Sequence, residues 1–323
     1  MAKQIGIIID YLTEDYRRQL DEAAARYGYT TRYFPNSRSA VGNADECEIL
    51  FGHCSQKVIA SAANLKWFCC CWAGVDQFCR DELYRQPDCL LSNSSGAYGV
   101  TIAEHLIMVS LGLLRRQLEY SAVIRRGGWE TLPGSIRSLC GCRITVLGTG
   151  DIGTQFARRA RAFAPARIVG VRRSVKPSDP AFDEIRPASE LDSILPDTEL
   201  LVMALPNTAD TAGILNRERM ALLPEGALVV NVGRGAAVDQ EALADALNSG
   251  HLGGAALDVV VPEPLPADHP LRGAKNLLLT PHVAGNTTLP YTRQRTIDLF
   301  IEDLANYAAG LPLKRRVDRR RGY

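Results

Sequence analysis

Three short segments in the C-terminal half of the chain carry side chains that can bind a carboxylate and move a proton. They are Val230–Asp239 with Arg234, Gly254–Leu265 with Asp258 and Glu263, and Thr280–Thr287 with His282. An arginine binds a carboxylate through two hydrogen bonds and polarises the adjacent carbonyl. A histidine exchanges protons near neutral pH, and a glutamate can hold the imidazolium in place. Together these residues predict a site that acts on the oxygen of a small carboxylic acid.

Each of these residues also has a structural interpretation when taken alone. A single histidine is more often structural than catalytic, and an arginine between two glycines can simply bridge a loop. The order Arg, Glu, His, with each residue near the end of an apolar run, favours the catalytic interpretation. We expect the other four histidines to be non-catalytic, with His53 bordering the substrate pocket: His53, His105, His251 and His269.

A glycine-rich segment, Gly148-Thr149-Gly150-Asp151-Ile152-Gly153, lies upstream of these motifs. It follows an apolar strand-like run and precedes an amphipathic stretch, which is the context of a dinucleotide-binding turn. The first glycine permits the tight turn, the second lets the backbone approach a pyrophosphate, and the third lets the helix pack on the strand. The helix N-terminus adds amide donors and positive potential. These six residues are therefore predicted to bind a dinucleotide.

The next strand-like run ends at Arg172-Arg173-Ser174. A site that prefers NAD normally places Asp or Glu here to bind the ribose hydroxyls. A guanidinium instead binds a 2′-phosphate with charge-assisted hydrogen bonds. The three residues therefore favour NADP, with NAD as the weaker alternative. The competing interpretation is an arginine pair on an exposed loop.

Apolar runs alternate with amphipathic stretches along the chain, as in parallel α/β folds. In the first hundred residues the predicted strands are Ile5–Ile9, Glu48–Phe51, Trp67–Cys71 and Leu90–Ser92. Later ones are Ile144–Leu147, Ile168–Val171, Leu200–Ala204, Leu228–Val232, Ala255–Val259 and Leu277–Thr280. The predicted helices are Glu14–Tyr27, Ser55–Ala63, Ile102–Leu114 and Tyr291–Ala309. The sequence thus predicts two α/β units.

With Ala73–Asp76 and Ile102–His105, the three motifs resemble those of the D-isomer-specific 2-hydroxy-acid dehydrogenases, in particular the glyoxylate/hydroxypyruvate reductase-like members that prefer NADP. The resemblance covers nearly the whole chain. It implies an oxidoreductase that transfers a hydride between NADP(H) and a 2-oxo acid/D-2-hydroxy acid pair, in the reductive direction. It also implies a Rossmann-type doubly wound parallel cofactor domain, 99–287, inserted in a flavodoxin-like substrate domain, 1–98 and 288–323.

The resemblance further implies contacts for individual residues. Asp258 is expected to bind the nicotinamide carboxamide or shape its pocket. Further cofactor contacts are expected from Leu205, Pro206, Thr211 and Val232. Substrate contacts are expected from Gly52, His53, Trp72, Ala73, Gly74 and Val75 beside Arg234 and His282. Phe51 and Tyr98 are candidates for the side-chain pocket, although core packing is an equal alternative for Phe51 and Trp72.

Composition narrows the remaining possibilities. The 323 residues carry a formal net charge of +1, which argues against a nucleic-acid footprint. No apolar run is long enough for a membrane span. The nine cysteines lack disulfide or metal-site spacing, so we expect reduced thiols, no metal and a cytoplasmic location. The helix Ile102–Leu114 and the segment through Trp129 resemble the dimer-forming region of the family, which predicts a homodimer.

Two other functions stay open at this point. Some proteins of this fold are dinucleotide-sensing corepressors that bind partner peptides, and others are formate or phosphite dehydrogenases. The complete Arg234, Glu263 and His282 set favours a 2-oxo-acid reductase over both. The motifs do not identify which 2-oxo acid is reduced. Glyoxylate and hydroxypyruvate are natural candidates, and Phe51, Trp72 and Tyr98 leave room for branched or aromatic acids.

Overall fold

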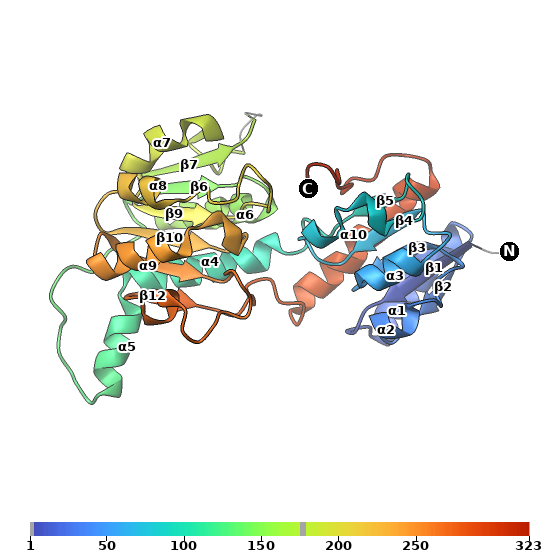
Figure 1. Ribbon diagram of the computed structural model, residues 1–323, viewed down its shortest axis with the longest axis horizontal. Helices are drawn as coiled ribbons and strands as arrows, with labels where there is room; N and C mark the ends of the chain where they lie inside the picture. Colours follow the sequence, from blue (N-terminus) through green and yellow to red (C-terminus); the bar gives the residue numbers. More distant parts are fainter. Residues whose placement is uncertain (1–2, 175–178, 323) are drawn as a thin grey trace. The chain divides into compact units, whose positions relative to one another are not determined.

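The computed structural model describes residues 3–174 and 179–322. The chain divides into two compact units (Figure 1). Unit 1 contains Met1–Tyr98 and Asn286–Tyr323, and unit 2 contains Gly99–Gly285. The chain therefore leaves unit 1 once and returns to it at its C-terminal end.

Unit 1 is built on a five-stranded parallel sheet with the strand order β2-β1-β3-β4-β5. Its helices and strands are β1 (Lys3–Ile8), α1 (Glu14–Arg26), β2 (Tyr29–Tyr33), α2 (Ser37–Ala40), β3 (Cys47–Gly52), α3 (Gln56–Ser61), β4 (Trp67–Cys70), β5 (Leu90–Ser92) and α10 (Pro290–Ala308). This order is the flavodoxin-like one, in which ligands bind beyond the carboxyl ends of the strands.

Both faces of this sheet are covered, so the strands are apolar on each side. α1 and α10 pack on one face, where Phe300 of α10 stacks on Phe51 with ring centroids 4.0 Å apart. α3 packs on the other face. Cys69 and Cys70 point to opposite faces and are fully buried, and burial raises the pKa of both thiols above the usual range. These cysteines are core residues.

Unit 2 contains a seven-stranded parallel sheet with the order β12-β11-β10-β9-β6-β7-β8. Its helices and strands are α4 (Gly99–Leu114), α5 (Gln117–Arg125), β6 (Arg143–Leu147), α6 (Asp151–Ala160), β7 (Arg167–Arg172), β8 (Glu184–Pro187), α7 (Leu191–Ile194), β9 (Leu200–Met203), α8 (Arg217–Leu222), β10 (Ala227–Asn231), α9 (Gln240–Ser249), β11 (Leu252–Leu257) and β12 (Leu277–Leu279). Strand order reverses between β6 and β9, which is the switch point of a Rossmann-type sheet.

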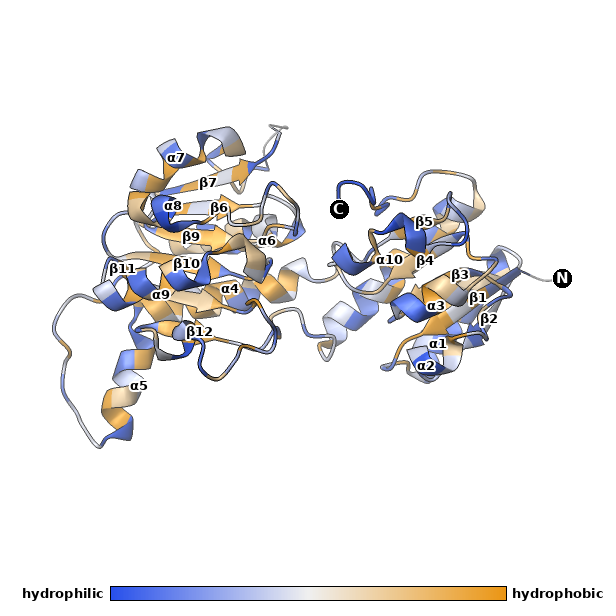
Figure 2. Cartoon of the chain, in the orientation of Figure 1, coloured by the Kyte–Doolittle hydropathy of each residue, from blue (hydrophilic) through white to orange (hydrophobic). Residues whose placement is uncertain are grey.

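The predicted α/β fold class, with a doubly wound cofactor sheet and a flavodoxin-like sheet, is confirmed. In both sheets the hydrophobic residues concentrate in the strands (Figure 2). Two strands, β2 and β8, were not predicted. Both lie at a sheet edge and are only partly buried, so their sequences lack the apolar run of a central strand. Among the described helices, none combines the length and the apolarity that crossing a membrane requires.

Candidate active site

The glycine-rich segment forms the turn from β6 into α6. Gly148 has a φ of +95°, and a Cβ there would lie 2.5 Å from the carbonyl oxygen of Ala204. A Cβ on Gly153 would lie 2.0 Å from the carbonyl oxygen of Gly148, so any side chain would push α6 off the sheet. A Cβ on Gly150 would meet nothing within 4 Å. The turn therefore has the close packing of a dinucleotide-binding loop and keeps one side open for a phosphate.

The N-terminus of α6 fits a pyrophosphate. Gly150 is its N-cap residue and provides no side-chain cap, so the first backbone N–H groups keep their donor capacity and the helix end is positive. The hydroxyl oxygen of Thr149 is buried and lacks a hydrogen-bond partner among the described residues. The carboxylate of Asp151 accepts a hydrogen bond from the N–H of Gly99 at 2.9 Å. Asp151 can therefore serve an anion only through its backbone amide.

β7 ends at Arg172, which is half-buried and is followed by the exposed residues Arg173 and Ser174. Three arginines that precede Arg172 in the chain pair with carboxylates of unit 2: Arg158 with Asp179, Arg161 with Asp183 and Arg167 with Glu184. Within the described ranges, no carboxylate pairs with the guanidinium of Arg172. Arg172 thus keeps its charge available at the carboxyl end of the strand.

The loop after β10 carries Arg234 and is held in place by two hydrogen bonds of the Asn231 side chain. The buried Asn231 side chain accepts a hydrogen bond from the Gly233 N–H at 3.0 Å and donates to the Arg234 carbonyl at 2.9 Å. A Cβ on Gly235 would lie 2.3 Å from the carbonyl carbon of Val260, so this loop packs closely on the one that follows β11. The Arg234 guanidinium is half-buried and donates to the Gly233 carbonyl at 2.8 Å. The loop therefore restricts the position of the guanidinium.

His282 and Glu263 form a pair beyond the ends of β12 and β11. Nδ1 of His282 lies 2.8 Å from Oε2 of Glu263. The other carboxylate oxygen of Glu263 accepts a hydrogen bond from the Val260 N–H at 3.1 Å. Because Nδ1 faces a carboxylate, it carries a proton, and Nε2 points away from the pair. The His282 side chain is 53% exposed, so its Nε2 can exchange a proton with a bound molecule.

Asp258 holds the turn that carries His282. Its side chain is buried, and its carboxylate accepts hydrogen bonds from the Thr280 hydroxyl and from the N–H groups of Val283 (2.9 Å) and Ala284 (3.0 Å). Its carbonyl accepts from the His282 N–H at 2.9 Å. The carboxylate is thus engaged by the protein itself. The nicotinamide contact expected from the family resemblance stays a prediction.

Comparisons with known proteins agree with this geometry. Residues 107–284 match the family model of the D-isomer specific 2-hydroxyacid dehydrogenase, NAD binding domain. The chain belongs to the D-isomer specific 2-hydroxyacid dehydrogenase family. The family predicted from the sequence is confirmed, and so is its enzyme class, an NAD(P)-dependent oxidoreductase.

Two curated relatives illustrate the family. Glyoxylate/hydroxypyruvate reductase A of Salmonella newport is 34% identical over 226 residues, which are 70% of each chain. D-3-phosphoglycerate dehydrogenase of Archaeoglobus fulgidus is 29% identical over 269 residues, covering 81% of this chain. The match spans only 49% of the length of that second relative.

Two solved structures of 2-hydroxyacid dehydrogenases share the whole fold. The Xanthobacter autotrophicus enzyme, solved with NADPH and MES, is 30% identical with a TM-score of 0.85 and covers 100% of both chains. The NADPH-dependent glyoxylate/hydroxypyruvate reductase of Sinorhizobium meliloti, solved with NADP and sulfate, is 26% identical with a TM-score of 0.83. It covers 99% of this chain and 100% of its own.

Three of the other four histidines of this 2-hydroxyacid dehydrogenase are held by contacts or burial within unit 2, as structural residues are. His251 contacts the Met220 carbonyl at 3.0 Å, and His269 accepts a hydrogen bond from the Leu271 N–H at 3.2 Å. His105 lies in α4, and burial lowers its pKa below the usual range while Asp258 acts in the opposite direction. These surroundings support the expectation that His282 is the proton-transferring histidine.

The predicted substrate residues of unit 1 fall into two groups. Phe51 and Tyr98 are buried, and the Tyr98 hydroxyl donates to the Cys71 carbonyl at 2.6 Å. Both lie in the core of unit 1, which for Phe51 is the packing alternative given above, and a role of either ring in a substrate pocket stays a prediction. Gly52 has a φ of +128°, and a Cβ there would lie 2.0 Å from the Ile8 carbonyl oxygen. His53 and the segment Trp72–Val75 follow the carboxyl ends of β3 and β4.

Several supporting residues were not predicted from the sequence. Asn231 and Thr280 hold the loops of Arg234 and His282. In unit 1, Asn93 donates to the Ala73 carbonyl at 2.7 Å, which fixes the turn after β4. Of these residues, only Asn231 could have been predicted from the sequence to have a supporting role. It is a polar residue that ends a buried apolar strand, and such a residue needs a hydrogen-bond partner.

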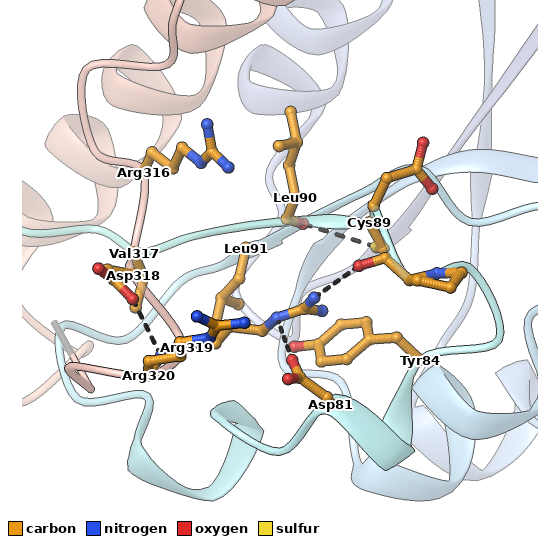
Figure 3. A pocket seen from close by; sticks show the side chains of 12 residues that line it. Asp81, Tyr84, Cys89, Leu90, Leu91, Arg316, Val317, Asp318, Arg319 and Arg320 are labelled. Carbon is orange, nitrogen blue, oxygen red and sulfur yellow. Dashed lines mark hydrogen bonds and ion pairs between the residues drawn. The ribbon is translucent and has the colours of Figure 1, made fainter.

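A cavity of unit 1 lies elsewhere, between the C-terminal segment and the residues around β5 (Figure 3). It measures about 850 Å³, and none of the predicted site residues lines it. Arg319 pairs with Asp81 at 2.9 Å, donates to the Pro87 carbonyl at 2.8 Å and lies 4.4 Å from the Tyr84 ring centroid. A cavity of about 530 Å³ in unit 2 is instead lined by His282, Glu263 and Asp258.

Proposed function

We propose that the protein is an NADPH-dependent reductase that converts a short 2-oxo acid into the D-2-hydroxy acid. The observation that carries this proposal is the 2.8 Å contact between His282 Nδ1 and Glu263 Oε2, found in a member of the 2-hydroxyacid dehydrogenase family. A carboxylate-bound imidazole with a free Nε2 is suited to giving a proton to a carbonyl oxygen.

The reduction needs one hydride and one proton. NADPH, held by the glycine turn and the N-terminus of α6, would supply the hydride. His282, protonated on both nitrogens, gives the Nε2 proton to the carbonyl oxygen, so that C=O becomes CH–OH. Glu263 keeps its bond to Nδ1–H throughout and stabilises the imidazolium before the transfer. Oxidation of the hydroxy acid would run through the same groups in reverse.

Arg234 would bind the carboxylate of the 2-oxo acid. Its loop is held by Asn231 and by close packing on the loop after β11, which reduces the cost of ordering the guanidinium on binding. A guanidinium bonds a carboxylate with two parallel hydrogen bonds and so fixes the orientation of the neighbouring carbonyl. The backbone of Trp72–Val75, and Gly52 and His53, are proposed as further substrate contacts.

NADP is the proposed cofactor. The glycine turn, Thr149 and the α6 N-terminus suit the pyrophosphate. Arg172, which pairs with no carboxylate among the described residues, suits the 2′-phosphate together with Arg173 and Ser174. The related enzymes of Xanthobacter autotrophicus and Sinorhizobium meliloti were solved with NADPH and NADP. Leu205, Pro206, Thr211, Val232 and Asp258 remain proposed neighbours of the nicotinamide half.

We also propose a homodimer, which would cover apolar side chains of α4, α5 and the following loop. Four of these are strongly exposed: Trp129 (93%), Met108 (58%), Ile124 (55%) and Ile136 (48%). Large exposed apolar side chains favour association, and the place of these four in the sequence matches the dimer-forming region expected from the family. The cytoplasmic location and the absence of nucleic-acid and membrane partners stay predictions.

The proposed function is tested by following NADPH oxidation with a panel of 2-oxo acids, including glyoxylate, pyruvate and hydroxypyruvate, and by assigning the configuration of the product. We expect turnover with at least one short 2-oxo acid and a D-configured hydroxy acid. Absence of turnover across the panel, or an L-configured product, would refute the proposal.

A further inference from the structure

The loop that follows β11 carries Glu263 and lies at the surface of unit 2. Val261 is 49% exposed, and the Glu263 side chain is 38% exposed. Val259 and Leu265, on either side of this exposed stretch, are buried. Burial therefore fixes the loop only at its two ends, and the position of Glu263 between them depends on hydrogen bonds.

Gln240 binds the part of the loop that precedes Glu263. Its side-chain oxygen accepts a hydrogen bond from the Val261 N–H at 2.9 Å, and its side-chain nitrogen donates to the Val261 carbonyl. Gln240 is the first residue of α9, and the N-cap residue Asp239 fixes this helix end by accepting a hydrogen bond from the Ala242 N–H at 3.0 Å. One side chain thus ties both backbone groups of Val261 to a capped helix.

Arg272 binds the part of the loop that follows Glu263. Its Nη2 donates a hydrogen bond to the Leu265 carbonyl at 2.6 Å, and its Nε donates to the Pro266 carbonyl at 2.8 Å. The neighbouring residue Leu271 is buried in the core of unit 2, which anchors the backbone of Arg272. Because the donors of a guanidinium have a fixed planar arrangement, one side chain holds both carbonyls at once.

Both sets of hydrogen bonds bear on the contact between Glu263 and His282. Val260, which precedes the residue that Gln240 binds, donates its N–H to Oε1 of Glu263 at 3.1 Å. Oε2 of the same carboxylate lies 2.8 Å from Nδ1 of His282. Arg272 lines the cavity of about 530 Å³ beside this pair. The carboxylate is therefore held by a loop whose backbone is bound on both sides of Glu263.

We propose that Gln240 and Arg272 are positioning residues that keep the Glu263 carboxylate against His282 in the geometry that proton transfer requires. The inference rests on the proposed reduction of a 2-oxo acid, in which Glu263 stabilises the imidazolium. The turn that carries His282 is held separately by Asp258, so Gln240 and Arg272 act on His282 through Glu263. Supporting hydrogen bonds of this kind keep a catalytic pair within a fraction of an ångström of its productive geometry.

The test is a double-mutant cycle with Glu263→Ala, measured as kcat for NADPH oxidation with a 2-oxo acid that the wild-type enzyme reduces. We expect Gln240→Leu and Arg272→Met each to lower kcat about tenfold, because displacement of a catalytic group can cost up to about 10²-fold. In the Glu263→Ala background the same substitutions should change kcat less than about twofold, since no carboxylate remains to be positioned. Arg272→Lys keeps a donor for one of the two carbonyls and should recover part of the loss.

Arg217→Met is the matched control, because Arg217 pairs with Asp245 and not with the loop of Glu263, and its kcat should remain that of the wild type. Thermal unfolding and NADPH binding report whether each variant is folded, and Gln240→Leu tests the inference where Arg272→Met does not fold.

Equal losses of kcat with and without the Glu263 side chain would overturn the inference while leaving the proposed function in place. Wild-type kcat in both single variants would do the same, and so would a raised KM for the 2-oxo acid at unchanged kcat, because the two side chains would then support substrate binding. A wild type that reduces none of the 2-oxo acids of the panel would overturn both.

Discussion

Oδ2 of the buried Asp258 accepts a hydrogen bond from the backbone N–H of Ala284 at 3.0 Å. Ala284 lies two residues beyond His282, which itself has a positive φ of 55°. A non-glycine residue adopts this strained conformation only where its surroundings stabilise it. Asp258 stabilises it here through its hydrogen bonds to the backbone of the turn. Asp258 is therefore a positioning residue for His282.

Asp258→Asn is expected to weaken this turn. The amide replaces one acceptor oxygen with a donor that faces a backbone N–H, which should lower the free energy of unfolding by about 1–3 kcal/mol. Displacement of the imidazole should lower kcat as well, by up to about 10²-fold. Thermal unfolding and steady-state kinetics measure both effects. The exposed Asp268→Asn is the matched control, and wild-type values for Asp258→Asn would contradict the positioning role.

Arg172→Asp is expected to reverse cofactor preference from NADPH to NADH. The 2′-phosphate would lose a charge-assisted contact of about 1.5–3 kcal/mol, or about ten- to hundredfold in kcat/KM, and would meet a carboxylate instead. The measurement is kcat/KM for both cofactors at low and moderate salt, because salt screens exposed charges.

Arg167→Asp is the control for this reversal. Arg167 lies at the other end of β7 and pairs with Glu184. The substitution therefore makes the same charge change on the same strand, but away from the proposed phosphate. Its cofactor preference should remain that of the wild type. If the wild-type enzyme uses NADH as well as NADPH, Arg172 and Arg173 are ordinary surface residues.

Arg234→Lys is expected to impair the use of 2-oxo acids. A lysine ammonium keeps the charge but cannot form the two parallel bonds of a guanidinium with a carboxylate. We expect kcat/KM for the 2-oxo acid to fall about ten- to hundredfold, corresponding to about 1.5–3 kcal/mol, with NADPH affinity retained. Unchanged kinetics with the 2-oxo acid would show that Arg234 does not bind the substrate carboxylate.

Trp129→Ser is expected to weaken the dimer, because Trp129 is almost fully exposed in the single chain and apolar surface of this size drives association. Light scattering should give about twice the 35.3 kDa chain mass for the wild type and a shift toward the single chain for the variant. Leu311→Ser, which removes another exposed apolar side chain in unit 1, should leave the mass unchanged. A 35.3 kDa particle for the wild type at micromolar concentration would refute the dimer.

The sequence predicted central strands and the dinucleotide turn because their signals are local. Buried parallel strands are continuous apolar runs, and Gly148, Gly150 and Gly153 have a spacing that follows from backbone geometry. The edge strands β2 and β8 were missed because half-exposed strands tolerate polar residues.

The support of the site could not be predicted, because it depends on contacts between distant segments. The family resemblance predicts a cofactor contact for Asp258, yet its carboxylate accepts hydrogen bonds from backbone N–H groups of a turn more than twenty residues further along the chain. Phe51 lies near the end of one apolar strand and Trp72 follows another, so the sequence alone does not distinguish them. The packing does, because the Phe51 ring is stacked in the core and the Trp72 ring is exposed.

The most direct test of the proposed chemistry is NADPH oxidation by His282→Asn, measured beside the affinity of the same variant for NADPH by fluorescence titration. Asparagine cannot exchange a proton at the Nε2 position, so kcat should fall about 10²- to 10⁴-fold while NADPH binds as it does to the wild type. Turnover close to that of the wild type, or a loss of NADPH affinity that accounts for the lost activity, would contradict proton transfer by His282.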